Sequence, residues 1–164
     1  YEIDRTLLDR RYRELQQALH PDRHASATAS TRALTLSKAV SVNEAYRVLR
    51  DDVKRAEALL QVLGAPAAQS PAEPELLMEM MELREALTDA RAAGQAGEVA
   101  RLSAEVRDKQ AAVQRELADI FAGIESPARA AQPGLSAAQN LLGRLRYYRR
   151  FQDEVAQFED EALT

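Results

Sequence analysis

The sequence predicts an all-α protein that consists of an N-terminal helical hairpin followed by a three-helix bundle. Of its 164 residues 46% are hydrophobic but only 5% are aromatic, and there are 6 glycines and 6 prolines. Ala, Leu, Arg and Glu, which favour helices, dominate the composition. Apolar residues also recur at helical spacing along most of the chain, and stretches containing Pro or Gly separate these helical patterns.

The first predicted helix follows Asp4, because a carboxylate suits the N-cap position. Its apolar stripe consists of Leu8, Tyr12, Leu15 and Leu19. The opposite face is basic, but it also carries acidic residues, so a solvated face of mixed charge is an equally good interpretation. The basic residues are Arg5, Arg10, Arg11 and Arg13, of which Arg11 lies closest to the apolar stripe.

This helix must end at residues 19–23 (LHPDR), because proline lacks an N–H and disfavours helical backbone at the residue before it. After a small polar loop, a second long helix carries a predicted buried stripe of Leu36, Ala39, Val42, Tyr46 and Leu49. Packed antiparallel, the two helices form a hairpin with His20, Pro21 and Asp22 at its tip. An ordinary hairpin with a polar turn is the simpler alternative.

A shorter third helix ends at Gly64, and its inward residues are Ala56, Leu59, Leu60 and Leu63. Residues 64–74 contain three prolines, which oppose both helix and sheet. We therefore expect an N-terminal domain at residues 1–63, a linker at 64–74 and a C-terminal three-helix bundle at 75–164.

The bundle helices are predicted at residues 75–93, 98–124 and 135–162, in an up-down-up arrangement. The first ends at Gly94 and Gly97, and a segment with two prolines at 126–134 precedes the last. The middle helix should bury Val99, Leu102, Val106, Val113, Leu117, Ile120 and Ile124. The last should bury Leu141, Leu145, Tyr148, Phe151 and Val155.

Composition argues against several functions. The chain has no cysteine, which excludes disulfides and thiolate metal sites. Its two histidines, His20 and His24, flank a Pro-Asp turn, so we expect no metal site and no cofactor. We find no catalytic constellation, no phosphate loop and no apolar run near the ~20 residues that span a bilayer. The net charge of −4 argues against nucleic acid as a partner. We expect a cytoplasmic protein that is not an enzyme.

A second apolar stripe on the helix at 75–93 points to protein binding. One face supplies the core residues Leu76, Met80, Leu83 and Leu87. The second stripe consists of Leu77, Met78 and Met81, bordered by Glu82 and Glu85. An exposed stripe of this kind indicates a partner, although a helix that packs on both sides explains it equally well.

The chain resembles the HscB family of J-domain co-chaperones over nearly its whole length. Five segments occur in the family's order: residues 12–16 (YRELQ), 20–23 (HPDR), 43–46 (NEAY), 55–60 (RAEALL) and 77–85 (LMEMMELRE). The resemblance implies a J-domain that docks on an HscA-like chaperone of the DnaK type and stimulates its ATPase. It also implies a C-terminal bundle that binds an IscU-like iron–sulfur cluster scaffold protein.

The resemblance implies two sets of binding residues. For the chaperone they are His20, Pro21, Asp22, Arg10, Arg13 and Arg23. For the scaffold they are Leu77, Met78, Met81, Glu82, Glu85 and Tyr147. Tyr147 stands where the family often has Phe, and Met81 where it often has Leu, so both positions stay apolar.

The chain departs from the family pattern in two other places. It starts after the short aromatic-containing helix that usually packs on the J-domain, so we expect a less stable J-domain. His24 stands where an aromatic residue is common, which affects how the loop packs. The absence of cysteine agrees with a bacterial form that lacks the zinc-binding extension of some eukaryotic relatives.

Two other functions are consistent with the sequence. One is a structural helical protein whose bundle mediates self-association and whose J-like turn is degenerate. The other is a general protein-folding J-protein, although Gly/Phe-rich and zinc-binding client regions are missing.

Overall fold

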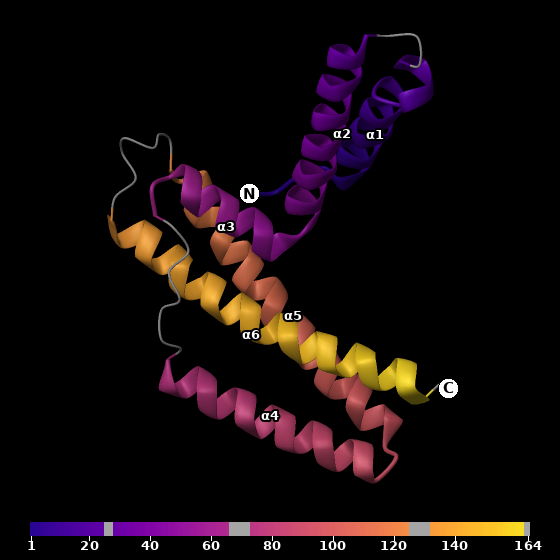
Figure 1. Ribbon diagram of the computed structural model, residues 1–164. Helices are drawn as coiled ribbons and strands as arrows, with labels where there is room; N and C mark the ends of the chain where they lie inside the picture. Colours follow the sequence, from indigo (N-terminus) through magenta and orange to yellow (C-terminus); the bar gives the residue numbers. More distant parts are fainter. Residues whose placement is uncertain (25–27, 66–72, 125–131, 163–164) are drawn as a thin grey trace. The chain divides into compact units, whose positions relative to one another are not determined.

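A computed structural model describes residues 1–24, 28–65, 73–124 and 132–162, and it confirms the all-α fold. The α-helices are α1 (Arg5–Ala18), α2 (Ala29–Arg50), α3 (Asp52–Val62), α4 (Pro74–Ala92), α5 (Ala96–Ala122) and α6 (Gln132–Ala162) (Figure 1). A short 3-10 helix, η1 (Pro21–His24), lies between α1 and α2. None of the described residues lies in a strand.

Two compact units make up the chain: Tyr1–Ala58 and Leu59–Thr164. The boundary between them lies within α3 (Asp52–Val62). Most of the linker expected at 64–74 lies outside the described residues, so the division into domains at 1–63, 64–74 and 75–164 stays a prediction.

Local sequence signals set the helix ends. The Asp4 carboxylate accepts a hydrogen bond from the Leu7 N–H at 2.9 Å and caps α1, as expected. Gly64 and Gly94 follow α3 and α4 with φ angles of 78° and 65°, a left-handed conformation that glycine adopts without strain. Their positions explain why the chain turns there.

In the first unit, α1 and α2 pack antiparallel through paired tyrosines. The rings of Tyr12 and Tyr46 stack with their centroids 3.8 Å apart. The Tyr12 hydroxyl donates to Asn43 Oδ1 at 2.9 Å, and the Tyr46 hydroxyl donates to Asp9 Oδ1 at 2.8 Å. These contacts join the helices of the hairpin by stacking and by hydrogen bonds.

The predicted apolar stripes of the hairpin are only partly covered. Leu36 is 64% exposed, and Leu15 and Leu49 are exposed as well, so their predicted burial was wrong. Two packed helices cover only the side of each that faces the other. Residues on the flanks of that contact keep much of their surface in water, even where the spacing is helical.

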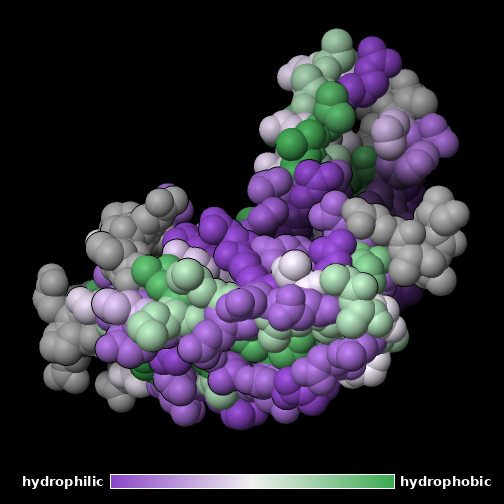
Figure 2. All heavy atoms as spheres, turned by 90° about the horizontal axis from the view of Figure 1, so that it is seen from below, coloured by the Kyte–Doolittle hydropathy of each residue, from purple (hydrophilic) through white to green (hydrophobic). Residues whose placement is uncertain are grey.

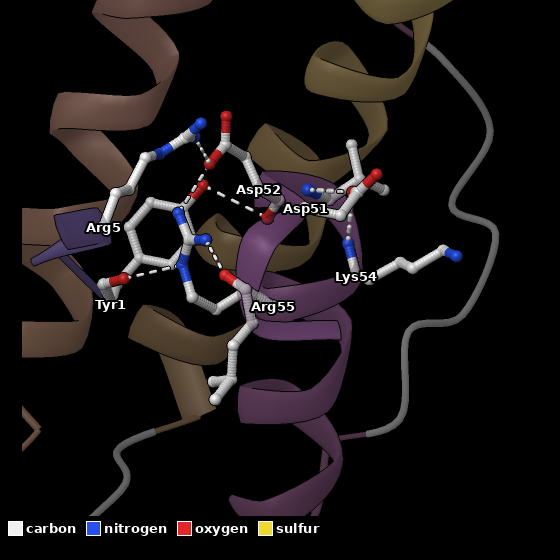
Figure 3. A network of polar contacts seen from close by, with 8 residues as sticks. Tyr1, Arg5, Asp51, Asp52, Lys54 and Arg55 are labelled. Atoms are coloured by element: carbon white, nitrogen blue, oxygen red, sulfur yellow. Dashed lines mark hydrogen bonds and ion pairs between the residues drawn. The ribbon is translucent and has the colours of Figure 1, made fainter. Parts of the chain in front are cut away.

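A buried polar cluster holds the start of the chain against the junction of α2 and α3 (Figure 3). Arg55 is only 7% exposed. Its Nε donates to the Tyr1 carbonyl at 2.8 Å, one terminal nitrogen donates to the Leu49 carbonyl, and the other contacts Asp52 Oδ1 at 2.6 Å. Arg5 reaches the same Asp52 oxygen at 3.1 Å. The cluster gives the buried guanidinium both a counter-charge and carbonyl acceptors.

In the second unit, α5 and α6 form the main antiparallel pair, and α4 packs chiefly on α5 (Figure 1). The predicted core residues of α4 and α6 are buried. In α5 the prediction failed near the end: Phe121 is buried, whereas Ile120 and Ile124 are only half-buried. The buried position in the last turn of α5 is thus Phe121, one residue after the predicted Ile120.

The α6 helix also begins earlier than expected. It starts at Gln132, so Pro133 and Gly134 lie in its first turn rather than in the connection. Proline is tolerated there because the first helical N–H groups have no acceptor within the helix.

Candidate functional site

The His-Pro-Asp turn lies at the tip of the hairpin, where α1 ends and η1 begins. His20 Nδ1 accepts the backbone N–H of Asp22 at 3.3 Å and lies 3.6 Å from the Asp22 carboxylate. The His20 side chain is 58% exposed and that of Asp22 is 90% exposed. The turn therefore presents an imidazole and a carboxylate to solvent, where a partner's cation could pair with Asp22.

Two pockets lie beside this turn: the larger between the end of α1, the turn and α2, and the smaller between the turn and α2. The larger encloses about 650 Å³ and is lined by Gln16, Gln17, Leu19, His20, Pro21, Arg23, Ala39, Val42 and Asn43. The smaller, of about 270 Å³, is lined by Leu19, Pro21, Arg32, Thr35, Leu36 and Ala39. Sequence reasoning missed both pockets.

The predicted basic residues of α1 are exposed, and Arg10 has an acidic neighbour on the same helix. Arg10 Nε lies 3.9 Å from Glu14, and Arg13 Nε donates to the Asp9 carbonyl at 3.2 Å. Arg11, which the sequence placed nearest the apolar stripe, is exposed too and contacts Glu14 at 3.0 Å. The face is therefore of mixed charge with a basic excess.

Arg23 lies on the turn itself. Its N–H donates to the His20 carbonyl at 3.1 Å, and its guanidinium reaches the Gln17 carbonyl at 3.5 Å. The exposed guanidinium thus lies beside the His-Pro-Asp residues, next to the end of α1.

The second apolar stripe of α4 is exposed. Leu77 is 41% exposed, Met78 62% and Met81 70%, and the neighbouring Glu82 and Glu85 are exposed as well. The core face of the same helix is buried, with Met80 at 1%. Figure 2, which views the molecule from the side where α4 lies in Figure 1, shows apolar patches among hydrophilic residues. The helix therefore keeps the core and the second stripe on different faces.

Tyr147, the predicted contact residue on α6, is half-buried, and the Arg150 guanidinium lies 5.9 Å from its ring centre. Two side-chain bridges connect its helix to α4. Arg84 on α4 holds Glu154 on α6 at 3.1 and 2.7 Å, and the Tyr148 hydroxyl donates to Glu79 Oε2 at 3.3 Å.

The two bridged pairs have nearly the same sequence separation, 70 and 69 positions. A constant separation means that residues on both helices advance in the same direction, so α4 and α6 run parallel. Tyr147 follows Leu77 by the same 70 positions, so the two residues lie level along the two helices. Arg84 follows Leu77, and Glu154 follows Tyr147, by seven residues, so Leu77 and Tyr147 lie on the sides of the two helices that the Arg84–Glu154 pair joins.

Within the described part of the chain, no group of three or more His, Asp or Glu side chains is placed to hold a metal ion. The helices described also include none that is long and apolar enough to cross a membrane.

A hairpin that displays a polar turn, followed by a bundle with an exposed apolar stripe, defines a helical protein with two candidate protein-binding surfaces. The HSCB C-terminal oligomerisation domain matches residues 72–156. The chain is 32% identical to the "Co-chaperone protein HscB homolog" of Shewanella oneidensis, over 99% of the chain and 92% of that protein. It is 34% identical to that of Azoarcus sp., over 99% of the chain and 87% of the relative. The chain belongs to the HscB family of co-chaperones.

Solved structures agree with this assignment. The chaperone HscB from Vibrio cholerae superposes with a TM-score of 0.80 and 30% identity, over 98% of this chain and 91% of that one. Human co-chaperone protein HscB has a similar fold, with a TM-score of 0.81 and 21% identity, over 96% of this chain and 76% of that one.

Proposed function

We propose that this chain binds an IscU-like iron–sulfur cluster scaffold protein, delivers it to an HscA-like chaperone of the DnaK type and stimulates the chaperone's ATPase. It would do so in the cytoplasm as an adaptor. The first unit would dock on the chaperone through His20, Pro21 and Asp22, assisted by Arg10, Arg13 and Arg23. The second would hold the scaffold on the α4 stripe and Tyr147.

The observation that carries this proposal is the exposed His-Pro-Asp turn at the hairpin tip. The Asp22 carboxylate is 90% exposed and faces water rather than a core partner. A residue kept so far from the core adds little to stability, so its presence there fits recognition better than folding.

Docking would act by differential binding. A chaperone with two conformations shifts towards the one that the turn and the basic residues of α1 bind more tightly. The charged groups and the surface shape of this chain favour one chaperone conformation over the other. ATP hydrolysis itself takes place in the chaperone. The scaffold, held on the other unit, would be presented to the chaperone at the same time.

Chaperone ATPase assays test the turn. His20→Gln and Asp22→Asn should abolish stimulation, while helix content and melting temperature stay nearly unchanged, because exposed substitutions usually shift stability by less than about 0.5 kcal/mol. Full stimulation by His20→Gln would contradict the J-domain assignment and favour a structural bundle with a degenerate turn.

A binding assay tests the second surface. The triple variant Leu77→Ala, Met78→Ala and Tyr147→Ala should lose scaffold binding, since apolar anchors dominate such interfaces. Circular dichroism must show that the variant is still folded. If it melts far earlier than the wild type, these side chains belong to the core, and if it binds scaffold normally, the site lies elsewhere.

A further inference from the structure

The α4 stripe and Tyr147 belong to two helices that meet at few points. Helix α4 packs chiefly on α5, α5 in turn packs on α6, and the backbones of α4 and α6 approach each other at few points, so side-chain bridges between them can contribute to their register beside the shared apolar core. The bidentate pair of Arg84 and Glu154 is one such bridge, with distances of 3.1 and 2.7 Å.

This pair lies on the same helix faces as the predicted scaffold contacts. Arg84 comes three residues after Met81 and seven after Leu77, so all three lie along one side of α4. Glu154 comes seven residues after Tyr147 on α6 and shares its side in the same way. The bridge therefore joins the side of α4 that carries Leu77 and Met81 to the side of α6 that carries Tyr147.

We propose that the Arg84–Glu154 bridge is a positioning clasp: it fixes the register of α4 on α6 and so aligns the α4 stripe with Tyr147 for the scaffold. The inference rests on the proposed function of this surface. Both side chains are 41% exposed, so the pair contributes little to overall stability. Its contribution is to preorganise a surface assembled from two helices.

Spin-label distances test the clasp without any scaffold. The chain has no cysteine, so labels attach only where one is introduced. Asp89→Cys on α4 and Ala156→Cys on α6 are exposed sites outside the pair and outside the stripe. In the double-labelled chain Glu154→Gln should broaden or shift the distance distribution. Arg101→Gln, which breaks the Arg101–Glu98 ion pair within α5 alone, is the matched control and should leave it unchanged.

Scaffold affinity tests the consequence. Arg84→Gln and Glu154→Gln should each weaken binding by about five- to tenfold at a temperature where all variants are folded, because the free surface is less preorganised. The charge swap Arg84→Glu with Glu154→Arg should restore both the distance distribution and the affinity. Stimulation of the chaperone without scaffold should stay at the wild-type level.

An unchanged distance distribution in Glu154→Gln would overturn the clasp. A swap that restores the distances but not the affinity would also overturn it, because the two residues would then contact the scaffold directly. If the wild-type chain binds no scaffold, the proposed function fails, whereas the distance measurement still decides whether the bridge sets the register.

Discussion

Arg55 donates to acceptors on three segments: the Tyr1 carbonyl, the Leu49 carbonyl and the Asp52 carboxylate. Replacing it with methionine would remove the closest cation of Asp52 and the guanidinium donors of the Tyr1 and Leu49 carbonyls. Breaking a buried ion pair costs roughly 3 kcal/mol, so Arg55→Met should lower the free energy of unfolding of the first unit by about that amount. Urea unfolding followed by circular dichroism measures this change.

Lys54 provides the control for that substitution. It precedes Arg55 on α3 but its side chain is exposed. Lys54→Met removes a positive charge from the same helix and should change stability by less than about 0.5 kcal/mol. Equal losses in the two variants would mean that net charge, and not the buried cluster, accounts for the effect.

Tyr1 makes the same cluster sensitive to alkaline pH. Burial, together with the Asp52 carboxylate, raises the pKa of Tyr1 to about 12. Because this folded-state pKa lies above the unfolded value of about 10, the stabilisation is complete below pH 10 and is lost as the pH rises towards 12. The melting temperature should fall more steeply above pH 10 in the wild type than in Tyr1→Phe. Tyr46 and Lys109, whose pKa values are also raised, remain in both proteins. Parallel curves would contradict the prediction.

At the scale of single elements, the basic face of α1 should act in docking. Reversing Arg10 and Arg13 to Glu should slow association with the chaperone, and wild-type association should weaken with salt, because exposed charges are screened over about 8–10 Å. Surface plasmon resonance at several ionic strengths measures both effects.

The matched control reverses Arg107 and Arg115, two exposed residues of α5, and changes the net charge by the same amount. Association that is independent of salt, or slowed equally by both reversals, would show that α1 has no specific part in docking.

The helices themselves were predictable because their signals are local. The N-cap Asp4, the break at Pro21 and the glycines after α3 and α4 each act within one or two turns of chain. Periodicity also identified the core faces of α4 and α6. It failed at Leu36 and Ile120, because the exposure of a residue depends on which neighbouring helix covers it, and spacing alone does not specify that.

The binding roles of the candidate surfaces remain predictions. Helical spacing identified the second apolar stripe of α4, the family resemblance supplied the two full sets of binding residues, and the structure places the turn and the α4 stripe, but not Tyr147, among the exposed residues. The partners of Arg55 and the Arg84–Glu154 bridge could not be predicted, because each joins residues far apart in sequence. Nor could the pockets beside the turn, which depend on how the turn and the end of α1 lie against α2.

At the scale of the whole molecule, the two candidate surfaces lie in different compact units: the turn in Tyr1–Ala58 and the scaffold face in Leu59–Thr164. If the protein is an adaptor, each surface should keep its own activity when the other is disabled. The triple variant of the scaffold face should therefore stimulate the chaperone as the wild type does in the absence of scaffold. It should lose only the additional stimulation that scaffold provides.

An adaptor must also carry both surfaces on one chain, which gives the last prediction. A His20→Gln chain should still bind scaffold but should not stimulate the chaperone, so in excess it should sequester scaffold from the wild-type chain. Titrating it into wild-type chain, chaperone and limiting scaffold should lower the ATPase rate towards the level without scaffold, following mass action. The control chain combines His20→Gln with the triple substitution at Leu77, Met78 and Tyr147, and it should not inhibit, because it lacks the apolar contacts that would hold scaffold. If the control chain inhibits equally, scaffold is not what the His20→Gln chain sequesters, and either association between chains or competition for the chaperone explains the inhibition. If neither chain inhibits, the adaptor proposal is contradicted. Stimulation by scaffold would then not require one chain to bind the scaffold and to carry a functional turn.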